Sequence, residues 1–218
     1  MRILQTIVGM MEVFCYLVHD EESGESILID PAGNEEQLLG DLKESGLKLT
    51  HIVNTHGHAD HTCGNARLRA ATGAPIVMHA LDDDFFREPP NQMFAQMMGF
   101  PLSPPADIRV RDGERLSFGR LAMEFIHTPG HTPGACCILI DNNLFTGDTL
   151  FVGAIGRTDL PGASLATLLD SLKRKILTLP PDTIVWPGHD YGDQPRSTIR
   201  REMETNPYII DFLSESDR

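Results

Sequence analysis

The sequence contains no long hydrophobic run and no excess of basic residues. Its longest uninterrupted apolar stretch, Val13 to Val18, is far shorter than the ~20 residues that a helix needs to cross a bilayer, so no membrane-spanning segment is expected. Lys and Arg number 18 against 31 Asp and Glu, and the net charge of −13 at pH 7 repels phosphate backbones and anionic lipids. We therefore expect neither a nucleic-acid partner nor a membrane surface.

We also expect neither an export signal nor a disulfide framework. The stretch Met1 to Thr6 has one basic residue followed by polar side chains, and no small-residue cleavage pattern is present. The cysteines lack the spacing of a disulfide framework, so we interpret all four as reduced thiols, and we expect a cytoplasmic protein. These cysteines are Cys15, Cys63, Cys136 and Cys137.

With 41% hydrophobic and 22% charged residues, the composition is typical of a globular protein. No repeat and no Gly/Ser linker divides the chain, so we expect a single domain over residues 1–218. Strand-like and helix-like segments alternate, which predicts an α/β protein with two mixed β-sheets covered by helices, the early strands being antiparallel. The expected strands are 12–19, 26–30, 51–54, 76–79, 121–127, 135–141, 143–145 and 183–186. The expected helices are 35–45, a stretch after 60 that ends near 73, and 165–177, the last capped by Ser164.

Residues 81–106 interrupt this alternation. The segment combines three consecutive aspartates, two Pro-Pro pairs and several Met and Phe residues, of which Met93/Met97 and Phe94/Met98 have the i,i+4 spacing of a helix. One interpretation is a short helix folded onto the core or a subunit contact. The other is a lid over a substrate pocket, because Met and aromatic surfaces adapt to varied apolar groups.

Three histidines and an aspartate lie within six residues, directly after the apolar pair Ile52-Val53. On an extended chain His56 and His58 point the same way, while Asp60 and His61 begin a helix and project at a different angle. One loop can therefore supply ligands to two neighbouring metal ions.

Three further candidates each follow a predicted strand: His131, Asp148 and His189. If these strands end at the same edge of a sheet, their loops converge with the histidine-rich loop. Imidazole and carboxylate ligands without thiolate suit Zn(II), Fe(II) or Mn(II). Two such ions with two carboxylates and a hydroxide leave a local charge of about +1, which favours a carbonyl oxygen or an anionic substrate. Asp30, at a strand end, either orients a ligand or caps its own turn.

The pattern Thr-His-Gly-His-Ala-Asp-His, followed by His131, Asp148 and His189, resembles the metallo-β-lactamase superfamily, and in particular its small stand-alone glyoxalase II-like hydrolases. The resemblance runs from about residue 12 to 193 and implies an αββα sandwich with the metals at one edge. It implies that one ion is bound by His56, His58 and His131, that the other is bound by Asp60, His61 and His189, and that Asp148 bridges them. It further implies hydrolysis of a thioester such as S-lactoylglutathione by attack of a metal-bound hydroxide, which Asp60 orients. Zinc is the expected metal, with iron or manganese as alternatives, and the expected partner is a small anionic thioester.

The chain departs from the classical glyoxalase II pattern in its glutathione-binding residues. The C-terminal helical domain of the classical enzymes has no counterpart in the 29 residues after His189. Arg157 stands near the place of a lysine that binds glutathione, Asp159 cannot replace the tyrosine, and Tyr191 matches another glutathione-contacting tyrosine. We therefore expect Arg157 and Tyr191 to bind substrate.

Persulfide dioxygenases of the same fold resemble the sequence as well. They keep the whole histidine motif but bind one Fe(II) through the equivalents of His56, His131 and Asp148, and they share the Gly-Arg-Thr-Asp stretch at 156–159. The continuation Leu160-Pro161-Gly162 is more similar to the stand-alone hydrolases, so we favour the hydrolase. A non-catalytic metal-binding protein is the third alternative.

Overall fold

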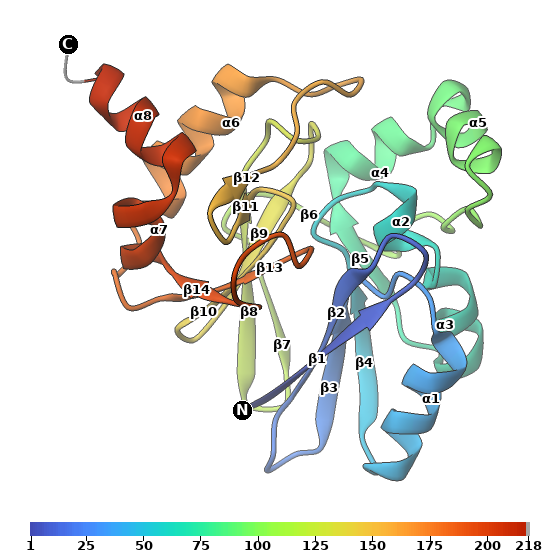
Figure 1. Ribbon diagram of the computed structural model, residues 1–218. Coiled ribbons are helices and arrows are strands. Elements are labelled where there is room, and N and C mark those ends of the chain that lie inside the picture. The colour runs from blue at the N-terminus through green and yellow to red at the C-terminus, as the bar shows by residue number, and fades with distance from the viewer. Residues whose placement is uncertain (217–218) are drawn as a thin grey trace.

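Two six-stranded β-sheets pack face to face, with helices on both outer faces (Figure 1). The structure is a computed structural model, and it describes residues 1–216. The arrangement is the αββα sandwich of two mixed sheets that the sequence predicts. No helix within the described residues is long and apolar enough to cross a lipid bilayer.

The first sheet has the strand order β1-β2-β3-β4-β5-β6. Its first three strands are antiparallel, as predicted, and the remaining neighbours are parallel. Strand β1 is absent from the prediction because most of its side chains are at least partly exposed, so it carries little of the apolar signal of a core strand. The strands are β1 (Arg2–Val8), β2 (Val13–His19), β3 (Glu25–Ile29), β4 (Lys48–Val53), β5 (Ile76–His79) and β6 (Ile108–Val110).

The second sheet has the order β14-β13-β10-β9-β8-β7. Strand β9 is antiparallel to both β8 and β10, and β10 is parallel to β13. Strands β8, β10 and β13 therefore run in the same direction and end at the same edge. The strands are β7 (Arg115–Phe118), β8 (Leu121–His127), β9 (Cys136–Ile140), β10 (Asn143–Gly147), β13 (Ile184–Pro187) and β14 (Ser197–Thr198), and a separate hairpin pairs β11 (Leu150–Phe151) with β12 (Ala154–Ile155).

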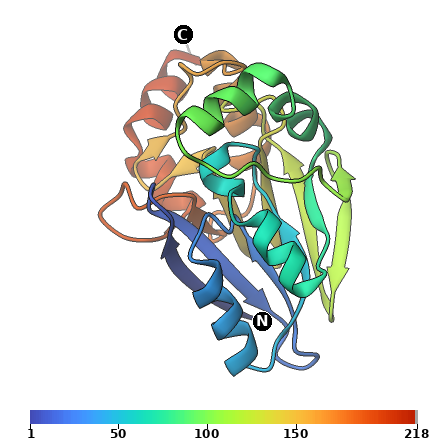
Figure 2. The ribbon, with the colours of Figure 1, turned by 90° about the vertical axis from the view of Figure 1, so that its right-hand side faces the viewer.

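Helices cover the first sheet on one side of the sandwich and the second sheet on the other (Figures 1 and 2). The Ser164 hydroxyl accepts a hydrogen bond from the Thr167 amide, which confirms the predicted N-cap. The last two helices were not predicted, because they are short and interrupted at Asn206-Pro207. The helices are α1 (Glu35–Glu44), α2 (Ala59–Thr62), α3 (Asn65–Thr72), α4 (Ala80–Phe86), α5 (Pro89–Met97), α6 (Leu165–Ser171) with its π-helical continuation η1 (Leu172–Ile176), α7 (Ile199–Thr205) and α8 (Pro207–Ser216).

Three apolar layers hold the sandwich together. The central layer lies between the sheets and includes Tyr16, Phe125 and Phe145, and the outer layers lie between each sheet and its helices. Burying side chains of this size removes about 1.5–3 kcal/mol of unfavourable apolar hydration each. All four cysteines are free, as predicted, and all four are buried.

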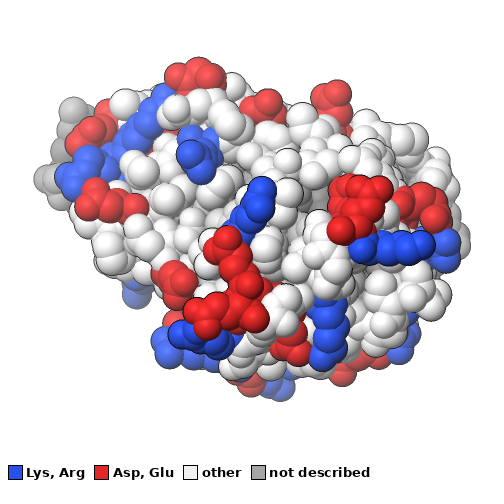
Figure 3. All heavy atoms as spheres, turned by 90° about the horizontal axis from the view of Figure 1, so that it is seen from below, with Lys and Arg blue, Asp and Glu red and all other residues white. Residues whose placement is uncertain are grey.

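The face seen from below carries both signs of charge (Figure 3). Blue and red side chains lie next to one another there, and that view shows no continuous basic patch.

The loops that follow β4, β8, β10 and β13 lie at the upper end of the sandwich, near α2 (Figure 1).

The segment 81–106 contains two helices, α4 and α5, and not one. The predicted apolar face of α5 does not pack on the core: Met93, Phe94, Met97 and Met98 are 51–80% exposed. Of the alternatives left open for this segment, packing of these side chains on the core is therefore wrong, while the subunit contact and the lid stay predictions. Their sequence spacing is correct for a helix, but α5 contributes only Ala95 to the interior.

Candidate metal centre

The loop after β4 is held in place by buried hydrogen bonds. The Asp30 carboxylate accepts from the Thr55 amide (2.8 Å) and hydroxyl (2.6 Å), and it contacts His61 Nδ1 at 3.1 Å. The Asn54 side chain donates to the His61 carbonyl at 3.1 Å. The backbone of Asp30 has a φ of +49°, an uncommon conformation that the surrounding contacts stabilise. Asp30 therefore orients His61, the first of the two roles that its sequence position left open.

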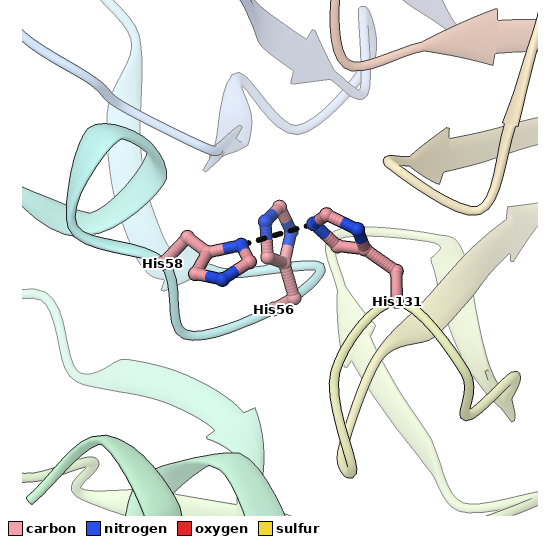
Figure 4. Close-up of side chains that lie close together, drawn as sticks. All are labelled: His56, His58 and His131. Carbon is pink, nitrogen blue, oxygen red and sulfur yellow. Dashed lines mark hydrogen bonds between the residues drawn. The ribbon is translucent and has the colours of Figure 1, made fainter. Parts of the chain in front are cut away.

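His56, His58 and His131 form the first cluster of donor atoms (Figure 4). One nitrogen from each ring lies within 4.8 Å of the others, and His58 Nδ1 is 2.9 Å from His131 Nε2. His131 Nδ1 is 2.9 Å from the Arg157 carbonyl, which can only accept, so Nδ1 carries the proton and Nε2 keeps a free lone pair. His56 Nε2 is buried without a hydrogen-bond partner. An orphaned nitrogen beside two other imidazoles fits a metal ligand.

Asp60, His61 and His189 form a second cluster, in which one donor atom from each residue also lies within 4.8 Å of the others. His61 Nε2 lies 3.3 Å from His189 Nε2 and 3.7 Å from the Asp60 carboxylate. The contact with Asp30 places the proton of a neutral His61 on Nδ1, which leaves Nε2 directed toward its two neighbours. His61 and His189 are buried, whereas Asp60 is partly exposed.

Asp148 lies between the two clusters. Its Oδ2 is 3.5 Å from His131 Nε2, and its Oδ1 is 3.4 Å from His61 Nε2 and 3.7 Å from His189 Nε2. Oδ1 is buried and has no hydrogen-bond partner. A Cβ on Gly188 would lie 2.4 Å from this oxygen, so the glycine leaves room for the carboxylate. One oxygen toward each cluster is the arrangement expected of a bridging ligand.

Burial and neighbouring charges set the protonation of these groups. Burial, together with neighbouring imidazoles, lowers the pKa of His56 well below its usual value and that of His58 to about 3. Burial also opposes protonation of His61, but Asp148, Asp60 and Asp30 outweigh it and raise the pKa of His61 to about 10. Neutral imidazoles are the form that binds metal, and a cation can replace the proton that these carboxylates attract to His61. The nitrogen and oxygen donors therefore fit two divalent cations.

Residues 8–189 match the metallo-beta-lactamase superfamily. The chain belongs to the metallo-β-lactamase superfamily. Two curated relatives show that different activities occur among its homologues. The human mitochondrial persulfide dioxygenase ETHE1 is 37% identical over 203 residues, which cover 90% of this chain and 71% of that protein. The hydroxyacylglutathione hydrolase GloC of Haemophilus influenzae is 36% identical over 201 residues, which cover 89% of this chain and 92% of that protein.

Solved structures of the superfamily share the fold closely. The B3 metallo-beta-lactamase BLEG-1 aligns with a TM-score of 0.87 at 32% identity, covering 95% of this chain and 99% of that one. TTHA1623 in a di-iron-bound form aligns with a TM-score of 0.81 at 36% identity, covering 94% of this chain and 99% of that one. The fold is therefore that of the superfamily.

The two predicted substrate-binding residues lie beside the clusters and are exposed. The Tyr191 ring stacks on His189, with ring centroids 5.0 Å apart and the planes 5° apart, and it also contacts Phe151. The Arg157 guanidinium forms two hydrogen bonds of 2.8 Å with the Asp159 carboxylate. The sequence places both residues near the site but does not predict this ion pair, so the Arg157 charge is already partly balanced.

Two supporting residues of the site lie outside the sequence motif. His127 Nε2 is 2.9 Å from the Pro133 carbonyl, so His127 supports the His131 loop. Asp82 is fully buried against both histidine-bearing loops and was missed. The only signal for it was the run of three consecutive aspartates at 82–84, which does not say which of the three is buried.

Proposed function

We propose that this superfamily member is a hydrolase that uses two divalent cations, zinc in the first place, to cleave a thioester such as S-lactoylglutathione. The observation that carries the proposal is the position of Asp148, which presents one carboxylate oxygen to His131 and the other to His61 and His189. Two cations bound by these donors would polarise a thioester carbonyl and lower the pKa of a water molecule toward neutrality.

In this proposal each cluster holds one cation. His56, His58 and His131 bind the first, and Asp60, His61 and His189 bind the second, with Asp148 shared. Asp60 is better placed than the other carboxylates to orient an attacking water, because its side chain is 22% exposed whereas that of Asp148 is 13% exposed. Asp30 is nearly inaccessible and serves to orient His61.

The substrate groups outside the thioester would lie against the exposed side chains beside the clusters. The Tyr191 ring offers an aromatic surface and a phenol hydroxyl, and Arg157 offers a cation for a substrate carboxylate. The bound cations would make this a positive region on a chain of net charge −13, which favours an anionic thioester.

The second candidate is a persulfide dioxygenase that uses a single Fe(II). It is supported by the 37% identity to the human persulfide dioxygenase and by the proximity of His56, His131 and Asp148, a set of two histidines and one carboxylate. The dioxygenases keep the whole histidine motif as well, so the second cluster does not separate the two activities. The continuation Leu160-Pro161-Gly162, which is more similar to the stand-alone hydrolases, gives the hydrolase its advantage.

The decisive experiment measures metal content per chain in anaerobically purified protein, together with turnover of S-lactoylglutathione and of glutathione persulfide. We expect about two metals per chain and hydrolysis of S-lactoylglutathione. His56→Ala and Asp148→Ala should lose metal and activity together. Cys136→Ala should retain both, because its thiol is buried in the core and contacts main-chain carbonyls of Asn54 and Thr55 and none of the donor atoms.

Opposite results would redirect the assignment. One iron per chain, no thioester cleavage, and oxygen consumption with glutathione persulfide would establish the dioxygenase. Full turnover and metal content in Asp148→Ala would show that the ligand assignment is wrong. Protein that takes up metal but turns over neither substrate would support a non-catalytic metal-binding role.

A further inference from the structure

Helix α4 packs against both loops that carry the first cluster of histidines. Its Asp82 side chain is buried, with a relative exposure of 0%. Asp82 Oδ2 accepts from the Gly57 amide at 2.8 Å and from the Thr132 hydroxyl at 2.7 Å, and Oδ1 accepts from the Gly134 amide at 2.5 Å. Gly57 lies between His56 and His58, and Thr132 directly follows His131. One carboxylate therefore joins the main chains that present the three imidazoles.

The contact between α4 and these loops is too close for side chains on two of the loop residues. A Cβ on Gly134 would lie 2.4 Å from the Asp82 amide nitrogen, and a Cβ on Gly57 would lie 2.2 Å from the Phe86 ring. Phe86 stands one helical turn after Asp82, and its ring centroid is 5.0 Å from that of His58. Asp82 and Phe86 thus form one face of α4 that fits the two loops.

Within the described part of the chain, the hydrogen bonds to the Asp82 carboxylate come from these loops, and none comes from a charged side chain. A buried carboxylate has a high desolvation cost, which hydrogen bonds from main-chain amides offset only when the geometry is maintained. The neighbouring Asp83 is equally part of α4, but its carboxylate accepts from the Ala106 amide and faces Arg109. Asp82 therefore contacts the two histidine-bearing loops, whereas Asp83 contacts Ala106 and Arg109.

We propose that Asp82 is a positioning residue that sets the distance between the loop of His56 and His58 and the loop of His131, and so tunes the affinity of the first metal site. The proposal rests on the proposed metal-dependent function. Asp82 touches none of the three imidazoles through a hydrogen bond, and it acts through the amides of Gly57 and Gly134 and the hydroxyl of Thr132. Removal of a group that orients metal ligands without binding the metal typically weakens metal affinity by about 10–100-fold.

The test is a Co(II) titration of chelator-stripped protein, followed by visible absorption. His131→Ala and His189→Ala identify which spectral change belongs to which cluster. Asp82→Asn keeps the shape of the side chain, but its NH₂ group must face an amide N–H on one side, so at least one loop amide loses its acceptor. We expect the first site to bind Co(II) about 10–100-fold more weakly and the second site to change by less than about threefold.

Asp83→Asn is the matched control, because it removes a buried carboxylate from the same helix without touching either loop. It should lower stability yet leave both Co(II) affinities within about twofold of the wild type. Thr132→Val removes one of the three hydrogen bonds and should weaken only the first site, by about two- to tenfold. This variant decides the question if Asp82→Asn does not fold, as judged by circular dichroism.

Wild-type protein that binds no Co(II) would overturn the proposed function and this inference with it. If Asp82→Asn and Thr132→Val both bind Co(II) at two sites with the affinities of the wild type, the inference is overturned while the proposed function stands. Equal weakening in Asp82→Asn and Asp83→Asn would also overturn it, because it would show a general loss of stability in α4.

Discussion

Arg157 contributes to the site through two different parts of the residue. Its carbonyl oxygen lies 2.9 Å from His131 Nδ1 and orients that ring, whereas its guanidinium binds the Asp159 carboxylate. Because the first contact belongs to the main chain, substitution of the side chain leaves it in place. The guanidinium bond holds the pKa of Asp159 at about 2, so the pair stays charged at neutral pH. Both side chains are more than 60% exposed, and ion pairs of this kind add little to stability.

We predict that Arg157→Ala raises KM for an anionic thioester by about two- to tenfold and changes kcat less, because a remote charge contact contributes mainly uniform binding. Asp159→Asn should do the opposite and lower KM, since it frees the guanidinium. Steady-state kinetics at low and high salt check both, and the differences should shrink at high salt. A loss confined to kcat in Arg157→Ala would contradict this role.

Helix α4 depends on a histidine at its N-terminus. His79 ends β5, and its Nδ1 accepts from the Leu81 amide at 3.3 Å, which caps the helix that carries Asp82. Its ring stacks on His127, with centroids 4.1 Å apart, at the end of a strand of the other sheet. Burial and the neighbouring His127 lower the pKa of His79 to about 4. The cap therefore requires a neutral imidazole.

The lowered pKa predicts a pH dependence of stability. Between the unfolded value near 6.5 and the folded value near 4, the unfolded chain binds the extra proton, so this contribution is present above pH 6.5 and is lost as the pH falls toward 4. The slope approaches about 1.4 kcal/mol per pH unit within that window. His79→Asn keeps an N-cap acceptor that does not titrate, so urea unfolding from pH 7 to 4.5 should show a shallower decline. Parallel curves for the wild type and the variant would contradict the assignment.

At the scale of the whole molecule, the candidate metal centre joins the two sheets. His56 to His61 follow a strand of the first sheet, and His131, Asp148 and His189 follow strands of the second. Cations bound by both groups would be lost on unfolding, because the unfolded chain does not hold these donors together. Metal binding should therefore stabilise the whole sandwich.

Chelation is predicted to lower the melting temperature. A single site at a free metal concentration of 100 times its Kd contributes about 2.7 kcal/mol to the free energy of unfolding. Calorimetry with and without EDTA should show a downward shift of several degrees for the wild type, reversed by Zn(II). Asp148→Ala, which lacks the carboxylate shared by both clusters, should show a smaller shift. An identical melting temperature with and without metal in the wild type would contradict a structural contribution of the cations.

Several elements follow directly from local patterns. Apolar runs predict most strands of both sheets, and Ser164 marks the start of its helix. Strand β1 and the final helices escaped prediction because an exposed edge strand and short helices carry weak periodic signals. The face of α5 has the correct spacing but is exposed, since periodicity defines a face without saying what covers it.

The sequence by itself determined the candidate ligands. Three histidines and an aspartate lie within six residues, and three further polar residues follow apolar strands. Neither secondary structure nor core packing requires such a pattern, so it points to ligands. The alternation of strands and helices also fitted two mixed sheets covered by helices, and the resemblance to the superfamily implied the αββα sandwich. The tertiary structure places Asp148 between the clusters, as the resemblance implied, and it alone decided that Arg157 is paired with Asp159 and that Asp82 joins two loops. Arg157 and Asp159 are two positions apart, and the conformation of their loop brings the two side chains together. Asp148 and Asp82 contact residues whose distances depend on how the sheets pack, and Asp82 and Gly134 are 52 positions apart in the chain. Local pattern carries no information about such distances.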